Sequence, residues 1–171
     1  MSWELISQRI HRAAILLLVF GVPSLFIQCA TDKVALELAH YVNQDILNIS
    51  ELEQKSLQKY ALVTGPNYTS DKRVYDTLKN DVLPVYKRFL TKLRDLSPKE
   101  VEVKKLHKFY IRGAELLYGG FKTKMLGLET NNVFVMQAAN KKIEKGRLET
   151  ERWRKELDLL AERHGLKKRG K

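Results

Sequence analysis

The stretch at residues 97–130, SPKEVEVKKLHKFYIRGAELLYGGFKTKMLGLET, decides the fold class of this chain. Ser97 is a suitable N-cap, Pro98 suits the first helical position and Glu100 suits the third, so a helix start is predicted here. Apolar residues then recur with the spacing of one helix face. They are Val103, Leu106, Phe109 or Tyr110, Leu117, Phe121, Met125 and Leu128. The stretch therefore predicts one long amphipathic helix that ends near Thr130.

A helical segment is also predicted directly after Thr31 and Asp32, a good helix start. Its apolar side consists of Leu38, Val42, Ile46, Ile49, Leu52 or Leu57, and Tyr60. Ser50 and Glu53 match a capping box, so this segment is either one long helix or two shorter ones. The segment ends at the turn signal of residues 65–67, Gly-Pro-Asn.

The next helical segment begins at Ser70 or Asp71. Its apolar stripe consists of Val74, Leu78, Val82, Val85, Phe89 and Leu93. Pro84 lies inside this segment and removes one backbone donor. A kink is therefore predicted near residues 80–83.

A last helix is predicted from about residue 132 to Arg163, and His164-Gly165 supply its stop. Its buried side consists of Val135, Ala139, Ile143, Leu148, Trp153, Leu157 and Leu160. Short connections between long amphipathic helices favour antiparallel neighbours. We interpret the chain as an all-α protein in which residues 31–164 form an antiparallel, up-down-up-down four-helix bundle.

The N-terminal sequence predicts a location. Residues 13–30, AAILLLVFGVPSLFIQCA, carry no charge and follow a positive flank with Arg9, His11 and Arg12. This order is typical of a secretory signal or an N-terminal membrane anchor. As a helix, these 18 residues would span about 27 Å, slightly less than a hydrocarbon core. Residues 1–30 are interpreted as a signal peptide or single-pass anchor, with the body on the extracytoplasmic side because the basic flank stays inside.

Cys29, the single cysteine, lies where this apolar block ends. The run LFIQC at residues 25–29 resembles a bacterial lipobox, which implies lipidation of Cys29 after cleavage. Gln28 departs from that pattern, because the position usually holds Gly, Ala or Ser. The alternative is an uncleaved anchor in which Cys29 is an interfacial residue. Both interpretations predict that the chain is attached to a membrane.

Patterns that would indicate catalysis or a metal are sparse. Glu37 and His40 form the only Glu-x-x-His pair in the sequence, whereas a di-iron bundle needs two such pairs and two further glutamates. The sequence has no Cys-x-x-Cys-His motif for attached haem. A haem held by His40, His107 or His164 with a methionine stays open. Motifs for nucleotide binding, zinc proteolysis and serine hydrolysis are also missing from the sequence. We expect a non-catalytic protein without a metal or cofactor.

Two groups of residues are candidates for partner binding. Gly113, Gly120 and Gly127 are seven residues apart in one predicted helix, where glycine is unfavourable by about 1 kcal/mol relative to alanine. Close approach of a neighbouring helix is the favoured explanation. A groove for a partner helix and a hinge at Gly119-Gly120 are the alternatives. Tyr60 and Tyr68 flank the predicted turn at residues 65–67, which is a candidate contact loop.

The net charge is +11, and part of the excess lies at the C-terminus. The tail at residues 165–171 contains Lys167, Lys168, Arg169 and Lys171 and no acid. Such a tail suits anionic lipid headgroups or a cell-wall polymer, or it is simply a solvated terminus. Nucleic acid is not expected as a partner outside the cytoplasm.

In its general layout, the chain resembles uncharacterised bacterial envelope proteins that have a lipoprotein-like anchor and a helical body. The stretches at residues 60–71, YALVTGPNYTSD, and 139–157, ANKKIEKGRLETERWRKEL, carry this resemblance together with the helix that contains Pro84. The resemblance implies fold and location and transfers no residue role. We expect a structural or protein-interaction subunit that contacts another envelope or membrane protein. The alternative is a carrier of a small molecule, lipid or haem, bound near the glycine-rich helix; an organelle membrane would suit the same layout.

Overall fold

The computed structural model describes residues 32–166, and all of its regular elements are helical. The chain forms α1 (Lys33–His40), η1 (Tyr41–Ile46), α2 (Leu47–Ala61), η2 (Gly65–Asn67), α3 (Asp71–Thr77), η3 (Leu78–Val82), α4 (Leu83–Asp95), α5 (Val101–Glu129) and α6 (Val133–Arg163). The segments η1 and η3 are π-helical, and η2 is a short 3-10 turn. The predicted all-α class is therefore confirmed for the described residues.

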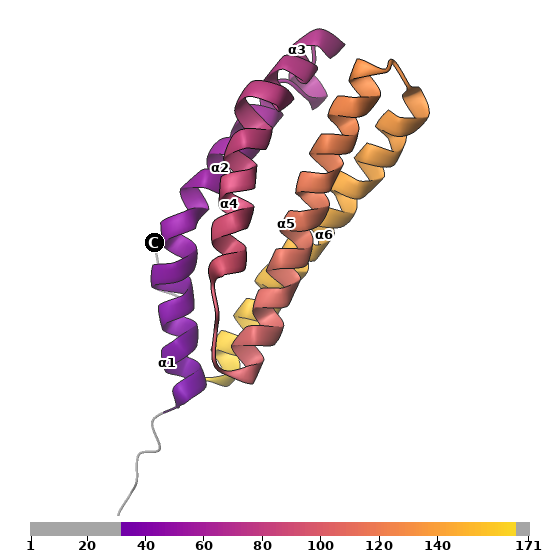
Figure 1. Cartoon of the computed structure of the whole chain (residues 1–171). Coiled ribbons are helices and arrows are strands. Elements are labelled where there is room, and N and C mark those ends of the chain that lie inside the picture. The colour runs from indigo at the N-terminus through magenta and orange to yellow at the C-terminus, as the bar shows by residue number, and fades with distance from the viewer. Residues whose placement is uncertain (1–31, 167–171) are drawn as a thin grey trace, which may run out of the picture. The chain divides into compact units, whose positions relative to one another are not determined.

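These elements form four antiparallel helical stretches, which Figure 1 shows running up, down, up and down. We call α1–η1–α2 with α3–η3–α4 the N-terminal pair, and α5 with α6 the C-terminal hairpin. Helix α4 packs against both α2 and α5, whereas α6 packs mainly against α5. The centre of the body contains Leu78, Tyr86, Phe89, Leu93, Phe121 and other fully buried side chains. None of the helices in residues 32–166 is both long and apolar enough to cross a membrane.

Glycines hold α5 and α6 close together. A Cβ atom at Gly113 would lie 2.7 Å from Oγ1 of Thr150, and one at Gly120 would lie 2.6 Å from Cγ1 of Ile143. At Gly127, it would lie 2.7 Å from Cγ of Met136. These distances are too short for real side chains, so the favoured close-approach interpretation is confirmed. The glycine face of α5 is covered by α6 of the same chain, which leaves no open groove for a partner helix along it.

Helix α5 is continuous from Val101 to Glu129. The hinge or break considered at Gly119-Gly120 is therefore wrong. The irregularity predicted before Pro84 is present, as the π-helical segment η3. A π turn adds one residue and rotates the following side chains. As a result Tyr86, rather than the predicted Val85, is the buried residue of this turn.

The predicted helix cap at Ser97 is wrong, and of the two alternatives for the first segment, the division at the Ser50–Glu53 capping box is not found. Residues 96–100 are not helical, and α5 begins at Val101 with Glu100 as its N-cap. The backbone N–H groups of Lys99 and Glu100 donate instead to the carboxylate of Glu37 in α1, at 2.5 Å for Glu100. A charged partner from a distant helix has thus replaced the local cap.

The second capping box, at Ser50 and Glu53, lies inside α2. The hydroxyl of Ser50 donates back to the carbonyl of Leu47, 2.8 Å away, and Glu53 is buried. The helix therefore runs through this point, with its irregular part at η1 instead. The other predicted starts are confirmed, because Asp32, Ser70 and Asn132 accept from the N–H groups of Ala35, Arg73 and Val135.

The predicted stop at His164-Gly165 is confirmed, since α6 ends at Arg163 and Gly165 has a φ of 67°. His164 lies 2.6 Å from a carboxylate oxygen of Asp32 and 3.2 Å from one of Glu102. This contact, which we call the clasp, joins the beginning and the end of the body. The anchor, lipidation and basic-tail predictions, which involve Cys29, Lys167, Lys168, Arg169 and Lys171, lie outside the described residues.

Candidate functional site

The beginning of α3 and the turn between α5 and α6 lie at the same end of the body (Figure 1). Exposed apolar side chains from both segments are found at this end. We call Tyr68, Val133 and Phe134 the tip. Their exposed fractions are 51%, 56% and 82%. Tyr68 and Val133 line one depression of about 330 Å³, and Phe134 follows Val133 in the first turn of α6. The predicted contact loop therefore lies beside a second exposed apolar segment.

The α6 part of the tip lies in a charge-free stretch of sequence, whereas Asp71 and Lys124 line the depression beside it. Residues 130–140, TNNVFVMQAAN, contain no Asp, Glu, Lys or Arg, although 30% of the chain is charged. Charge depletion together with aromatic residues and methionine is typical of the centre of a protein–protein interface. Nearby polar groups are already paired, since Tyr68 donates to Asp71 at 3.1 Å and Lys124 donates to Asn140 at 2.8 Å. Burial also lowers the pKa of Lys124.

A groove lies between α2 and α6, with part of α5 as its floor. Its volume is about 420 Å³, and its apolar lining includes Leu57, Tyr60, Leu117, Phe121 and Ile143. The ring of Tyr60 packs on that of Phe121, with centroids 4.8 Å apart, and burial raises the pKa of Tyr60 to about 12. Tyr60 thus belongs to this groove and Tyr68 to the tip, so the two tyrosines serve different surfaces.

Glu53 is the unusual residue of this groove. Its side chain lines the groove and is only 8% exposed. Oε2 accepts a hydrogen bond from the hydroxyl of Tyr110, 2.6 Å away, whereas Oε1 has no partner among the described residues. Burial raises the pKa of the Glu53 carboxyl, and burial also raises that of Tyr110. Tyr110 in turn stacks on Trp153, with ring centroids 4.1 Å apart.

A second buried polar contact lies lower in the body. The hydroxyl of Tyr41 is 3.0 Å from Nδ1 of His107, and burial lowers the pKa of His107. Nε2 of His107 is buried without a partner among the described residues. Because Tyr41 and His107 come from the N-terminal pair and the C-terminal hairpin, this contact helps to set the register between them.

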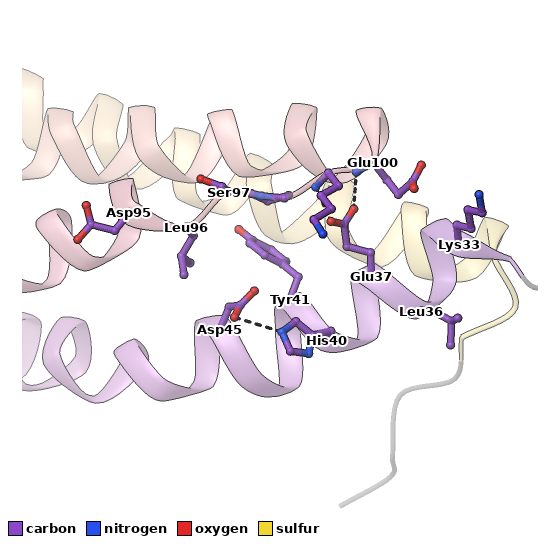
Figure 2. A pocket seen from close by; sticks show the side chains of 12 residues that line it. Lys33, Leu36, Glu37, His40, Tyr41, Asp45, Asp95, Leu96, Ser97 and Glu100 are labelled. Atoms are coloured by element: carbon purple, nitrogen blue, oxygen red, sulfur yellow. Dashed lines mark hydrogen bonds and ion pairs between the residues drawn. The ribbon is translucent and has the colours of Figure 1, made fainter.

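A third cavity, of about 640 Å³, separates the first helical stretch from the connection at residues 95–100. Figure 2 shows Glu37 directed at that connection and His40 directed at Asp45, 3.5 Å away. The two members of the Glu-x-x-His pair therefore have different partners. The part of the chain that the structure describes contains no group of three or more residues suited to a metal ion.

Comparisons of the chain with protein families, curated proteins and solved structures give no match. The interpretation of these sites therefore rests on the geometry of this structure alone. The sequence pattern does not identify two of the residues that define them. Glu53 matches a capping box, and Phe134 lies outside the apolar stripe of its predicted helix. The charge-free run at residues 130–140 is the sequence signal that points to Phe134.

Proposed function

We propose that this chain is a membrane-anchored, non-catalytic subunit that binds another envelope or membrane protein through its tip. The observation that carries this proposal is the 82% exposure of Phe134 within a charge-free run of a well-capped helix. A solitary exposed apolar residue needs no explanation, but an exposed aromatic beside further apolar residues marks an interaction surface. The apolar block at residues 13–30 supports the anchor.

The composition around Phe134 favours a protein over a lipid surface. Asn131, Asn132, Gln137 and Asn140 are exposed neutral side chains in the same run. Amide groups donate and accept hydrogen bonds, as the rim of a protein interface requires. A helix that lies on a bilayer typically carries Lys or Arg on its polar face instead.

Site-specific photo-crosslinking in the native membrane tests the tip. A photoreactive residue in place of Phe134 should give one discrete protein adduct, and Val133→Asp should abolish that adduct. The same photoreactive residue in place of Leu148, an exposed residue in the middle of α6, is the matched control and should give none. Adducts only with lipid, or equal adducts at both positions, would overturn the proposal.

The intact mass of the protein extracted from its native membrane tests the anchor. A species that starts at Cys29 and carries acyl mass would support a lipoprotein, and the full unmodified chain would support a single-pass anchor. A chain that begins after Cys29 without acyl mass would contradict both. Protease treatment of intact spheroplasts should then cleave the body if it faces the periplasm.

A carrier function is the second candidate, and the groove beside Glu53 favours it. The groove has the volume of a small-molecule site and an apolar lining with few polar groups. The groove reaches α5 at Phe121, next to Gly120. The alternative prediction from the sequence puts a small-molecule site in this part of the glycine-rich helix. A buried carboxyl, that of Glu53, is among its polar lining groups, which fits an amphipathic small molecule better than haem.

A further inference from the structure

The groove between α2 and α6 contains a buried acceptor that the body itself does not satisfy. Tyr110 has one hydroxyl proton, and it donates that proton to Oε2 of Glu53. Oε1 of the same carboxyl is buried and has no partner among the described residues. A buried carboxyl oxygen without a hydrogen bond is unfavourable, and a donor at Oε1 would remove that penalty.

The surroundings of Glu53 suit a positively charged donor. Tyr60 and Phe121 supply aromatic rings to the same groove. An ammonium group gains both from a carboxylate and from the face of an aromatic ring. Leu57 and Ile143 supply aliphatic lining for a hydrocarbon portion.

We propose that this groove binds an amphipathic primary amine, with its ammonium group on Glu53 and its hydrocarbon chain along the apolar walls. The proposal rests on the carrier function given above as the second candidate, and it names the class of ligand. It does not depend on the tip, which is formed by other residues.

Positively charged residues at the rim of the groove could instead favour a negatively charged ligand. Arg147 and Arg154 line the groove together with Glu151, and all three are exposed. If these arginines dominated recognition, an anionic amphiphile would bind best. If Glu53 dominates recognition, a cationic amphiphile will bind best. The sign of the charge on the preferred ligand therefore shows which residues recognise it.

Three probes with the same six-carbon chain separate these cases. Hexylamine, hexanol and hexanoate are titrated into the full-length chain in a non-ionic detergent, in a Trp3→Phe background. The fluorescence of Trp153, which stacks on Tyr110 beside Glu53, reports occupancy. Hexylamine should bind about tenfold or more tightly than hexanol, as expected for a charge-assisted hydrogen bond, and hexanoate should bind most weakly.

Glu53→Gln should reduce hexylamine binding by about tenfold while changing hexanol binding by less than about threefold. Glu51→Gln is the matched control, because it removes the same charge from an exposed position of α2 outside the groove, and it should change hexylamine binding by less than about threefold. Should the Glu53→Gln chain fail to fold, the order of the three probes in the unsubstituted body is still decisive.

The outcomes separate the two levels of the proposal. Saturable hexanol or hexanoate binding without an amine preference would overturn the amine assignment and leave a carrier function. No saturable binding of any probe would overturn both. Equal losses of hexylamine binding in the Glu53→Gln and Glu51→Gln chains would show attraction by overall charge, which also overturns the assignment to Glu53.

Discussion

The C-terminal hairpin and the N-terminal pair achieve helix packing in different ways. In the hairpin, two uninterrupted helices meet through glycines, and added Cβ atoms at Gly113, Gly120 and Gly127 would collide with α6. In the N-terminal pair, both helical stretches contain π-helical segments, and a carboxyl group lies buried. The hairpin thus consists of regular, closely packed helices, whereas the departures from regular helix geometry and one wall of the groove beside Glu53 belong to the pair. The contrast predicts different mutational behaviour in the two regions.

The largest effect is expected at Phe121, where the two regions meet. Its ring contacts Tyr60 and Tyr86 of the N-terminal pair, with centroids 4.8 Å and 5.5 Å away. Phe121→Ala should lower the free energy of unfolding by about 3–5 kcal/mol, because it leaves a cavity in the core. Phe134→Ala, at the tip, is the matched control and should change it by less than about 0.5 kcal/mol. Denaturant titration measures both, and similar losses would contradict the assignment of Phe134 to an exposed surface.

The next prediction tests the close packing of α5 against α6 in the hairpin. Gly120→Ala should destabilise the body by about 1–3 kcal/mol, because the new methyl group overpacks the contact with α6. At the adjacent Gly119, a Cβ would meet only the flexible end of Lys142, 3.4 Å away. Gly119→Ala should therefore stabilise the chain by up to about 1 kcal/mol through helix propensity. Thermal unfolding followed by circular dichroism distinguishes the pair, and equal changes would remove the argument for close approach.

A comparable effect is expected where the two regions share a hydrogen bond. Tyr110→Phe removes the only donor to Glu53 among the described residues and should cost about 1–3 kcal/mol. Burial raises the pKa of Glu53 and the Tyr110 hydrogen bond lowers it, so the substitution should raise this pKa further. A carboxyl with a raised pKa is most favourable to folding at low pH, and that contribution is lost as the pH rises through the folded-state pKa. The loss in Tyr110→Phe should therefore grow between about pH 5 and pH 8.

A double-mutant cycle supplies the control for this prediction. Tyr110→Phe in a Glu53→Gln background should lose the pH dependence, because glutamine does not titrate. An unchanged dependence in that background would assign it to another group. His107, whose pKa is lowered by burial, is the group to examine in that case.

The smallest effect is expected at the clasp, which is partly exposed to solvent. The hydrogen bond to Asp32 raises the pKa of His164, and the Ala35 N–H together with His164 lowers that of Asp32. The stabilisation from His164 is present below the ordinary histidine pKa and is lost as the pH rises through its folded-state value. That from Asp32 is lost as the pH falls through its own lowered pKa. The clasp is therefore strongest in mildly acidic solution.

His164→Gln should abolish this contribution, which is read as the difference in unfolding temperature from the unsubstituted chain across about pH 5–8. The difference should shrink as the pH rises. A difference that grows with pH in His164→Gln would contradict the sign of the argument.

The sequence predicts regular local features of this body well and long-range ones poorly. The helix starts at Asp32, Ser70 and Asn132 depend on one side chain and a nearby N–H group, so local pattern suffices. Gly113, Gly120 and Gly127 are costly in a helix, which favours the inference of close packing over the alternatives of a groove or a hinge. The start at Ser97 was predicted wrongly because the competing acceptor, Glu37, comes from a different helix.

The same reasoning explains the result for the candidate sites. Glu53 matches a capping box in sequence, and only its burial against Tyr110 reveals another role. Tyr60 and Tyr68 are close along the chain, but the turn between them directs one to the groove and the other to the tip. Which surface each tyrosine lines depends on the helices that pack around it. The spacing of residues along the sequence does not contain that information.

The clasp also determines how the body would respond to mechanical load. Asp32 and His164, which are 2.6 Å apart, are the residues through which tension on the two chain ends would enter. Such tension pulls the ends apart at one point, so contacts would break one after another, as in unzipping, instead of being sheared together. The packed rings around Phe121 and the tip would remain unloaded until the clasp had opened. Force-spectroscopy traces pulled from these ends should therefore show an early, low-force event that His164→Gln removes.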